Sequence, residues 1–342
     1  MKKPVLFIFI LILSFCTAAN LGAQDSRVNS YSLRNLLNYQ YRTSVITIQR
    51  LAFKDDLQHA YNVSFTSMGL TVSGRLSIPT AAPDNIKGIV IMLRGYQRLS
   101  TYYTGKGTEN ASLTYIQNGW IVISPDFLGY ALSSPIPSPD FMAQFYSTIN
   151  AVELYKSLEL IAAPQTRPSP QVFQYSSSVP LTDRVTLPVS FKKIVLWGHS
   201  NGGQVALHFL EIIQKPVDTV LWAPVCIDFP DSAGHFGRGA AWAESFKELY
   251  TARDFSLFNY LDKIAEGTRI RLNHGDADTS TPISWSDALS KAIEDENIRR
   301  DANRRGRILL RYARHQGADH NMYPARIRSS VLANDVLFWE EN

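Results

Sequence analysis

Six continuously apolar runs, separated by segments of helical periodicity, constrain the fold of this chain more than any other feature. Continuous rather than alternating apolar runs are typical of strands buried on both faces of a sheet. Strands that alternate with helices predict right-handed crossovers and one mostly parallel, twisted sheet with helices on both faces, an α/β fold. The runs span residues 88–93, 120–124, 193–197, 219–224, 270–273 and 307–313, and the helix-like segments span 141–161, 202–213, 283–295 and 323–339.

Two alternating runs precede this predicted parallel sheet. Residues 61–67 and 70–79 place apolar side chains at every second position, and Gly69 lies near the turn between them. This pattern predicts an antiparallel hairpin. We expect residues 24–59 to form a partly helical N-terminal extension and residues 60–342 to form a single main domain.

The first 23 residues have the features of a secretory signal peptide. Two lysines precede an apolar run over residues 4–15, and small residues follow. The run is shorter than the roughly 20 apolar residues that a membrane-spanning helix needs, so we expect export to the periplasm or the medium without an integral span. Cleavage after Ala19 or Ala23 fits the small-residue rule. Lipoprotein attachment at Cys16 is disfavoured, because Phe15 occupies a position where such signals need a small residue.

Charge and cysteine content exclude several classes of partner. The formal net charge of +4 falls to +2 once the two lysines of the leader are removed, which does not favour a nucleic-acid partner. Only Cys226 remains after that removal, so no internal disulfide is expected, and we interpret Cys226 as a buried residue. The histidines and acidic residues show no tight ligand spacing, so we expect neither a metal nor a cofactor. The oligomeric state stays open.

Three segments differ in composition from the elements around them. Residues 164–191 are rich in Pro, Ser and Thr and predict an irregular surface loop, and residues 296–307 alternate arginine with acidic residues and predict a solvated helix end. Both lead into strands, which places them away from the carboxyl edge of the sheet. Residues 225–266 instead follow a strand. They are therefore the candidate lid or cap at the edge where open α/β sheets bind ligands.

The stretch Gly198-His199-Ser200-Asn201-Gly202 matches G-x-S-x-G between a buried strand and a helix. At such a turn the serine is held in a strained conformation, and glycines two positions before and after it avoid clashes. The turn presents the serine hydroxyl above the sheet, with the backbone N–H of Asn201 directed to where an oxyanion would form. A glycine-rich turn with an incidental serine is the alternative.

A nucleophilic serine needs a base, and the base needs an acid that holds its tautomer. In the order serine, acid, base, the chain supplies candidates after two later strands. Asp278, with Asp276 in reserve, follows strand 270–273, and His320, with His315 in reserve, follows strand 307–313. The remaining histidines, including His199, are expected to be surface, helix-face or turn residues, and His274 is expected to help shape the acid's loop.

Several of these segments resemble the catalytic domain of the prolyl oligopeptidase family and its dienelactone-hydrolase-like relatives among the α/β-hydrolases. The segments are GIVIMLRGYQ, GWIVISPDFLGYALSS, VLWGHSNGG, LNHGDADTSTP and GADHN, and the resemblance covers about residues 60–340. It implies Asp278 as the acid, with Thr281 where the family usually has valine, and His320 as the base. It also implies the backbone N–H of Tyr96 as the second oxyanion donor.

Two departures from the family pattern bear on activity. Arg94 stands where the family usually has histidine, and it is interpreted either as altering the electrostatics of the oxyanion corner or as a surface-paired arginine. The chain has no propeller repeats, which favours small esters or short peptides. Arg94, Phe236 and Trp242 are the candidate pocket residues. We therefore expect an exported serine hydrolase that acts on carboxylic esters, with a small peptidase or a non-catalytic binding protein as alternatives.

Overall fold

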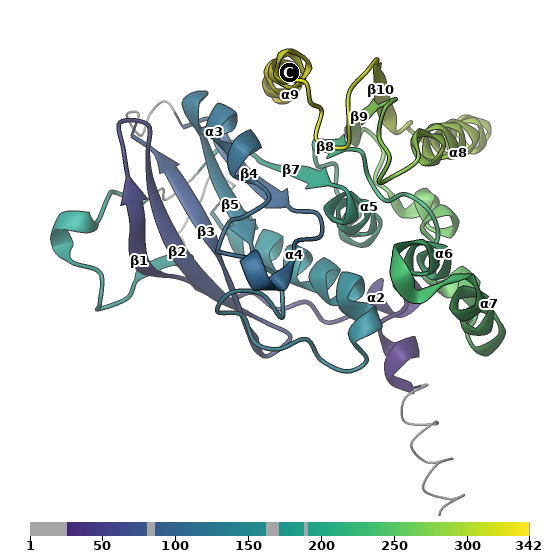
Figure 1. Ribbon diagram of the computed structural model, residues 1–342, viewed down its shortest axis with the longest axis horizontal. Coiled ribbons are helices and arrows are strands. Elements are labelled where there is room, and N and C mark those ends of the chain that lie inside the picture. The colour runs from purple at the N-terminus through teal and green to yellow at the C-terminus, as the bar shows by residue number, and fades with distance from the viewer. Residues whose placement is uncertain (1–25, 81–85, 162–170, 188–190, 342) are drawn as a thin grey trace, which may run out of the picture.

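A computed structural model describes residues 26–80, 86–161, 171–187 and 191–341, so the predicted leader lies outside the described residues. The strands are β1 (Ile46–Lys54), β2 (Gln58–Ser67), β3 (Leu70–Pro79), β4 (Gly88–Leu93), β5 (Trp120–Pro125), β6 (Phe173–Tyr175), β7 (Ile194–His199), β8 (Thr219–Trp222), β9 (Arg269–Gly275) and β10 (Leu309–His315). They form one sheet in the order β10-β9-β8-β7-β4-β5-β3-β2-β1-β6 (Figure 1).

The centre of this sheet is parallel, as the continuous apolar runs predict. Strands β5, β4, β7, β8, β9 and β10 pair in parallel in that order, and β3, β2 and β1 add an antiparallel portion. Every residue of β4, β5 and β7 is buried. The register aligns the carboxyl ends of the central strands, because Gly198 pairs with both Leu93 and Leu221. Loops that leave these strands therefore begin side by side at one edge.

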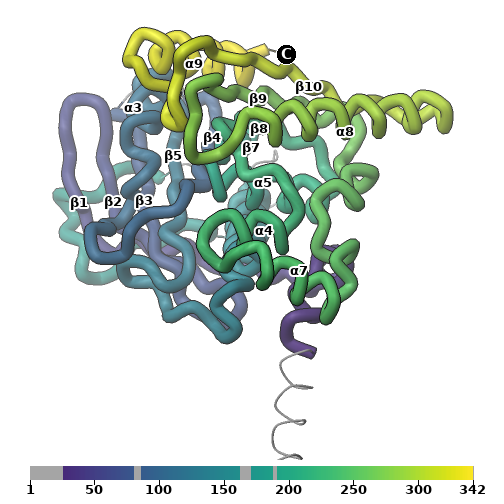
Figure 2. The backbone as a smooth tube through the Cα atoms, turned by 45° about the vertical axis from the view of Figure 1, so that its right-hand side comes forward, coloured from purple at the N-terminus to yellow at the C-terminus, as the bar shows by residue number. Residues whose placement is uncertain are grey.

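Helices cover both faces of the sheet. They are α2 (Leu33–Leu36), α3 (Glu109–Gln117), α4 (Ala143–Glu159), α5 (Asn201–Ile213), α6 (Phe229–Ala233), α7 (Ala240–Leu249), α8 (Ile283–Ala302) and α9 (Ala325–Glu340). One apolar cluster packs α4 and α5 against the sheet, and a second packs α3 and α9 against the other face. Figure 2 shows α8 projecting from one side of the molecule. The four predicted helices are confirmed as α4, α5, α8 and α9.

Short helical turns complete the chain between these elements. They are η2 (Leu99–Thr101), η3 (Asp140–Met142), η4 (Leu181–Asp183), η5 (Gly234–Arg238), η6 (Ala252–Phe255), η7 (Leu257–Asn259) and η8 (Leu261–Lys263). The candidate lid, residues 225–266, contains α6, α7 and four of these turns. It is thus mostly helical.

Two strands were missed by the sequence patterns. The N-terminal extension contains the helix α2, but its residues 46–54 form β1, which was not expected and which pairs with β2. The loop at residues 164–191 was expected to be irregular, but its residues 173–175 form β6, which pairs in parallel with β1. Half of β1 is exposed, and β6 has only three residues. Neither therefore carries the apolar pattern on which recognition of a strand depends.

The arginine-rich end of α8 and the strand after it also differ from expectation. Arg300 is buried rather than solvated: its side chain is 1% exposed, pairs with Glu296 at 2.9 Å and donates to the carbonyl of Ile264 at 2.6 Å. It therefore ties α8 to the end of the lid segment. Strand β10 was expected to be buried on both faces, but it lies at the edge of the sheet, and Leu309 is 50% exposed.

Candidate active site

Ser200 lies at the sharp turn between β7 and α5, in a backbone conformation that residues other than glycine rarely adopt. Its φ of 54° and ψ of −122° store about 1–3 kcal/mol of backbone strain. Two backbone hydrogen bonds hold the turn: Ser200 N–H donates to Trp222 O at 3.0 Å, and Val225 N–H donates to Ser200 O at 2.9 Å. The loop after β8 thus supports the serine.

The two glycines of the turn are required by close backbone contacts. A Cβ on Gly198 would lie 2.7 Å from the carbonyl oxygen of Gly202. A Cβ on Gly202 would clash with the carbonyl oxygen of Leu93, at the end of β4. Any larger residue at either position would therefore push α5 away from the sheet.

His320 and Asp278 meet at this edge of the sheet from the loops after β10 and β9. The Nδ1–H of His320 donates to Oδ2 of Asp278 at 2.7 Å. The other oxygen, Oδ1, accepts from the backbone N–H of Ser280 at 2.7 Å and of Thr281 at 3.0 Å. The carboxylate is therefore fixed on both oxygens, as a residue that orients an imidazole must be.

Side-chain donors also reach Oδ2 of Asp278. The Thr281 hydroxyl donates at 2.7 Å, and the Nε2–H of His274 lies 3.2 Å away. Burial acts to raise the pKa of Asp278. Hydrogen bonds from His274, His320 and Thr281 outweigh it, so the pKa lies well below its ordinary value. Asp278 is thus held ionised next to His320.

The two reserve candidates have other partners. Asp276 accepts from the backbone N–H of Gly317 at 2.6 Å, and Nε2 of His315 lies 3.0 Å from Oδ1 of Asn273. Neither is hydrogen-bonded to the pair of His320 and Asp278.

A cavity of 690 Å³ brings the candidate residues together. Ser200, His320 and both candidate oxyanion donors, Asn201 and Tyr96, line it. Asn201 is the first residue of α5, and the first residue of a helix has no intrahelical acceptor for its N–H. The Tyr96 N–H has no backbone acceptor within the described ranges. Both amides are thus available to a developing negative charge.

Of the three expected pocket residues, only Phe236 lines this cavity. The residue is 54% exposed and belongs to η5 in the lid segment. Trp242 instead packs into an aromatic cluster with Phe141 and Phe246, at centroid distances of 5.5 and 5.4 Å. Most aromatic side chains of the lid segment therefore anchor it to the domain, whereas Phe236 lines the same cavity as Ser200.

Arg94 is buried rather than paired at the surface, and it directly precedes the loop that carries Tyr96, a candidate oxyanion donor. It is 4% exposed and lies over the rings of Tyr130 and Tyr102, at 3.9 and 4.7 Å from the ring centroids. Its guanidinium donates to Gly95 O at 2.9 Å and to Asp126 O at 2.5 Å. The arginine thus joins the loop that carries Tyr96 to the loop after β5.

Sequence reasoning assigned no role to His199, but its ring contacts the candidate base. The Nε2–H of His199 donates to the backbone O of His320 at 2.9 Å, and the two ring centroids are 4.6 Å apart. Burial, reinforced by the neighbouring His320, lowers the pKa of His199 to about 3, so the ring is neutral. In the sequence, only its position next to Ser200 singles out His199, and that position does not predict a hydrogen bond to a residue 121 positions away.

Cys226 has the properties of a buried structural residue. Its side chain is inaccessible, and burial raises the pKa of its thiol to about 12. Among the residues that the structure describes, no three or more histidine, cysteine or acidic side chains gather in a way that could hold a metal ion. Among the helices of the same described residues, none is long and apolar enough to cross a bilayer.

Comparison with known proteins identifies the fold. No protein-family model and no curated protein sequence matches the chain. Acetyl xylan esterase 1 from Thermoanaerobacterium sp. JW/SL YS485 superposes with a TM-score of 0.56 at 14% identity, over 94% of this chain and 93% of that one. The S-formylglutathione hydrolase of Agrobacterium tumefaciens gives a TM-score of 0.52 at 16% identity, over 84% and 97%.

A peptidase has a similar domain within a longer chain. Dipeptidyl peptidase 4 of Porphyromonas gingivalis gives a TM-score of 0.57 at 12% identity and matches 84% of this chain. This chain spans only 36% of that one. Together with the sheet order, these matches show that the chain has the α/β-hydrolase fold, which confirms the predicted fold class and the resemblance at the level of fold.

Proposed function

We propose that this protein is an exported serine hydrolase that cleaves carboxylic esters by two-step acyl transfer. The observation that carries the proposal is the arrangement around one cavity: Ser200 at a strained turn, His320 bonded to Asp278, and two backbone amides. The fold neighbours include esterases and peptidases, which supports a hydrolase. Export rests on the N-terminal sequence alone.

In the proposed mechanism, the Ser200 hydroxyl attacks the ester carbonyl while Nε2 of His320 accepts its proton. Asp278 holds the imidazole with Nδ1 protonated and stabilises the imidazolium that forms. The backbone N–H groups of Asn201 and Tyr96 bind the oxyanion. His320 then protonates the leaving alcohol, and a water molecule, activated by the same histidine, hydrolyses the acyl-enzyme and regenerates Ser200.

The candidate anchors for a peptide substrate lie outside the Ser200 cavity, which favours an ester. Asp231 and Glu244 are the acidic candidates in the lid segment for anchoring a peptide amine, but both pair with Lys247, at 2.7 and 3.0 Å. Arg238, a candidate anchor for a peptide carboxylate, pairs with Asp140 at 3.0 Å. None of these three residues lines the Ser200 cavity, whereas Val225 and Phe236 offer apolar contacts to an acyl group there.

Labelling with a fluorophosphonate probe tests the nucleophile. We expect labelling of the wild type and none of Ser200→Ala; equal labelling of the variant would refute the assignment. His320→Ala should abolish turnover of 4-nitrophenyl butyrate, and His315→Ala should retain it. The reverse result would show that His315 is the base.

A substrate panel separates the three candidate functions. We expect turnover of short-chain 4-nitrophenyl esters and none of aminoacyl anilides. Turnover of both classes would indicate a peptidase. Turnover of neither, with no labelling of Ser200, would indicate a binding protein on the same fold.

A further inference from the structure

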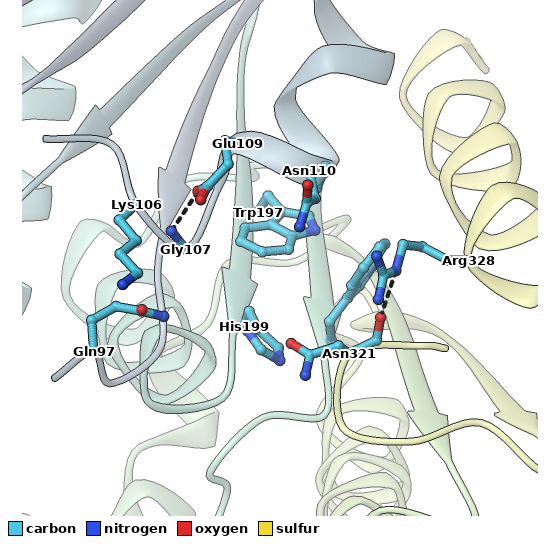
Figure 3. Close-up of a pocket in the computed structure, with 11 residues that line it drawn as sticks. Gln97, Lys106, Gly107, Glu109, Asn110, Trp197, His199, Asn321 and Arg328 are labelled. Carbon is cyan, nitrogen blue, oxygen red and sulfur yellow. Dashed lines mark hydrogen bonds between the residues drawn. The ribbon is translucent and has the colours of Figure 1, made fainter. Parts of the chain in front are cut away.

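A second cavity, of 340 Å³, adjoins the candidate active site, and Phe236 is not part of its lining. It lies between the start of α3, the strand β7 and the helix α9 (Figure 3). Gln97, His199 and Asn321 line both this cavity and the one that contains Ser200. A substrate bound at Ser200 thus has this second cavity as its neighbour.

Two cations lie on opposite sides of the second cavity. Figure 3 shows Lys106 beside Gln97 on one side and Arg328 beside Asn321 on the other, with His199 between them. The Lys106 ammonium donates to the backbone and hydroxyl oxygens of Thr101. Arg328 donates through Nε to the carbonyl of Asn321 at 2.9 Å. Within the described part of the chain, neither cation forms a salt bridge with a carboxylate.

One carboxylate also lines this cavity, but it forms no salt bridge with either cation. Glu109 is the one carboxylate in the lining, and its oxygens already accept from the backbone N–H of Gly107 and Thr108 and from the Tyr103 hydroxyl. The lining of the cavity therefore includes two cations without a carboxylate partner, which suits an anion.

We propose that this cavity is a subsite for an anionic group, a carboxylate, on the leaving alcohol of the ester. This inference rests on the proposed ester hydrolysis at Ser200. The apolar side chains of Val225 and Phe236 line the other part of the Ser200 cavity, where an acyl chain fits. The leaving group must lie beside His320, and the next residue, Asn321, borders the second cavity. The anion then lies between Lys106 and Arg328.

Paired substrates test this subsite. The probes are 4-(butyryloxy)benzoate, which is anionic, and its neutral methyl ester, which carries the same acyl group. These esters differ in leaving-group ability, so the decisive quantity is the change in their ratio of kcat/KM between wild type and variant. Arg328→Gln should lower the ratio of anionic to neutral substrate by about three- to tenfold, as expected for one partly exposed charge contact. Lys106→Gln should lower it in the same direction.

Matched variants separate charge from structural damage. Arg328→Lys should preserve most of the ratio, because it retains the positive charge. Arg326→Gln removes an arginine from the same helix, outside the lining of the cavity, and should leave the ratio unchanged. An equal ratio in wild type and Arg328→Gln, or an equal fall in Arg326→Gln, would overturn the subsite.

Failure of the subsite is distinguishable from failure of the proposed function. Hydrolysis of both esters with a ratio insensitive to Arg328 would leave ester hydrolysis intact and refute the subsite. If neither ester is hydrolysed and Ser200 is not labelled, the proposed function fails. Binding of 4-hydroxybenzoate, followed by tryptophan fluorescence, then decides the subsite separately. Binding that Arg328→Gln weakens severalfold supports it, and absence of binding at millimolar concentration refutes it.

Discussion

Replacement of Thr281 by valine removes one hydroxyl that donates to Asp278, the acid of the proposed triad. Valine and threonine have almost the same shape, so the packing at position 281 changes little. The Thr281 hydroxyl donates to Oδ2 of Asp278 at 2.7 Å, the same oxygen that accepts from His320 at 2.7 Å. The two donors therefore share the negative charge of one oxygen. Without the hydroxyl, more of that charge is available to stabilise the imidazolium of His320.

The size of the effect follows from the distances around Thr281. A hydrogen bond to a charged group contributes about 1.5–3 kcal/mol, and 2.7 Å is typical of a strong one. The Thr281 oxygen also lies 3.2 Å from Nδ1 of His320, and valine removes this contact too. The contact opposes the main effect, but it is longer and competes with Asp278 for the same proton. We expect the net change to be about half of the stronger interaction, close to 1 kcal/mol, which corresponds to about 0.7 pH units.

The assay is the pH dependence of kcat/KM for 4-nitrophenyl butyrate. Because the imidazolium must lose its proton before it can act as a base, the acidic limb of the profile should move to higher pH by about that amount in Thr281→Val. Thr281→Ser retains the hydroxyl and serves as the control, with its limb close to that of the wild type. An unmoved limb in the valine variant, or a serine variant that moves equally, would refute the argument that Thr281 sets the charge on Asp278.

Three further changes test other parts of the structure. His199 is neutral in the fold because its pKa is about 3, whereas that of an unfolded histidine is about 6.5. Unfolding therefore takes up a proton as the pH falls through this range, and the free energy of unfolding should drop by about 2 kcal/mol between pH 7 and pH 5. Urea titration of His199→Gln should show a smaller drop in this free energy. Arg300→Met should destabilise the fold by about 3–5 kcal/mol, because it removes the buried partner of Glu296. Arg299→Met changes a side chain that is 63% exposed and should alter stability by less than about 1 kcal/mol. Similar denaturation midpoints for both variants would contradict the importance of the buried pair. Phe236→Ala should lower kcat/KM for butyrate esters more than for acetate esters, and a parallel fall for both would show that this ring does not contact the acyl chain.

The parts of the fold that could be predicted are those in which local pattern and burial coincide. Strands β4, β5 and β7 are buried on both faces, so their apolar runs are continuous and unambiguous. The edge strands β6 and β10, and β1 next to β6, were harder, because they expose much of their surface and do not need apolar residues there. β6 is a strand only because β1 lies beside it.

The candidate site divides in the same way. The nucleophile turn is a local structure, and its glycines are needed by contacts within a few residues and by the end of a neighbouring strand, so Ser200 could be identified from the sequence. Asp278 and His320 could be placed because each follows a strand that ends at the same edge of the sheet. What these side chains touch was not predictable: the bond from His199 to His320, the hydroxyl of Thr281 on Asp278 and the buried position of Arg94 join segments that are distant in the chain.

The sequence alone determined the parallel α/β sheet, the turn that presents Ser200 and the order of the candidate acid and base, because each depends on a short-range pattern or on the direction of a strand. Only the tertiary structure decided which aromatic side chain of the lid faces Ser200 and which charges remain unpaired beside it. Phe236 and Trp242 look alike in sequence, and Arg328 looks like Arg326. Their difference is one of burial and neighbours, which depend on how distant segments pack against one another.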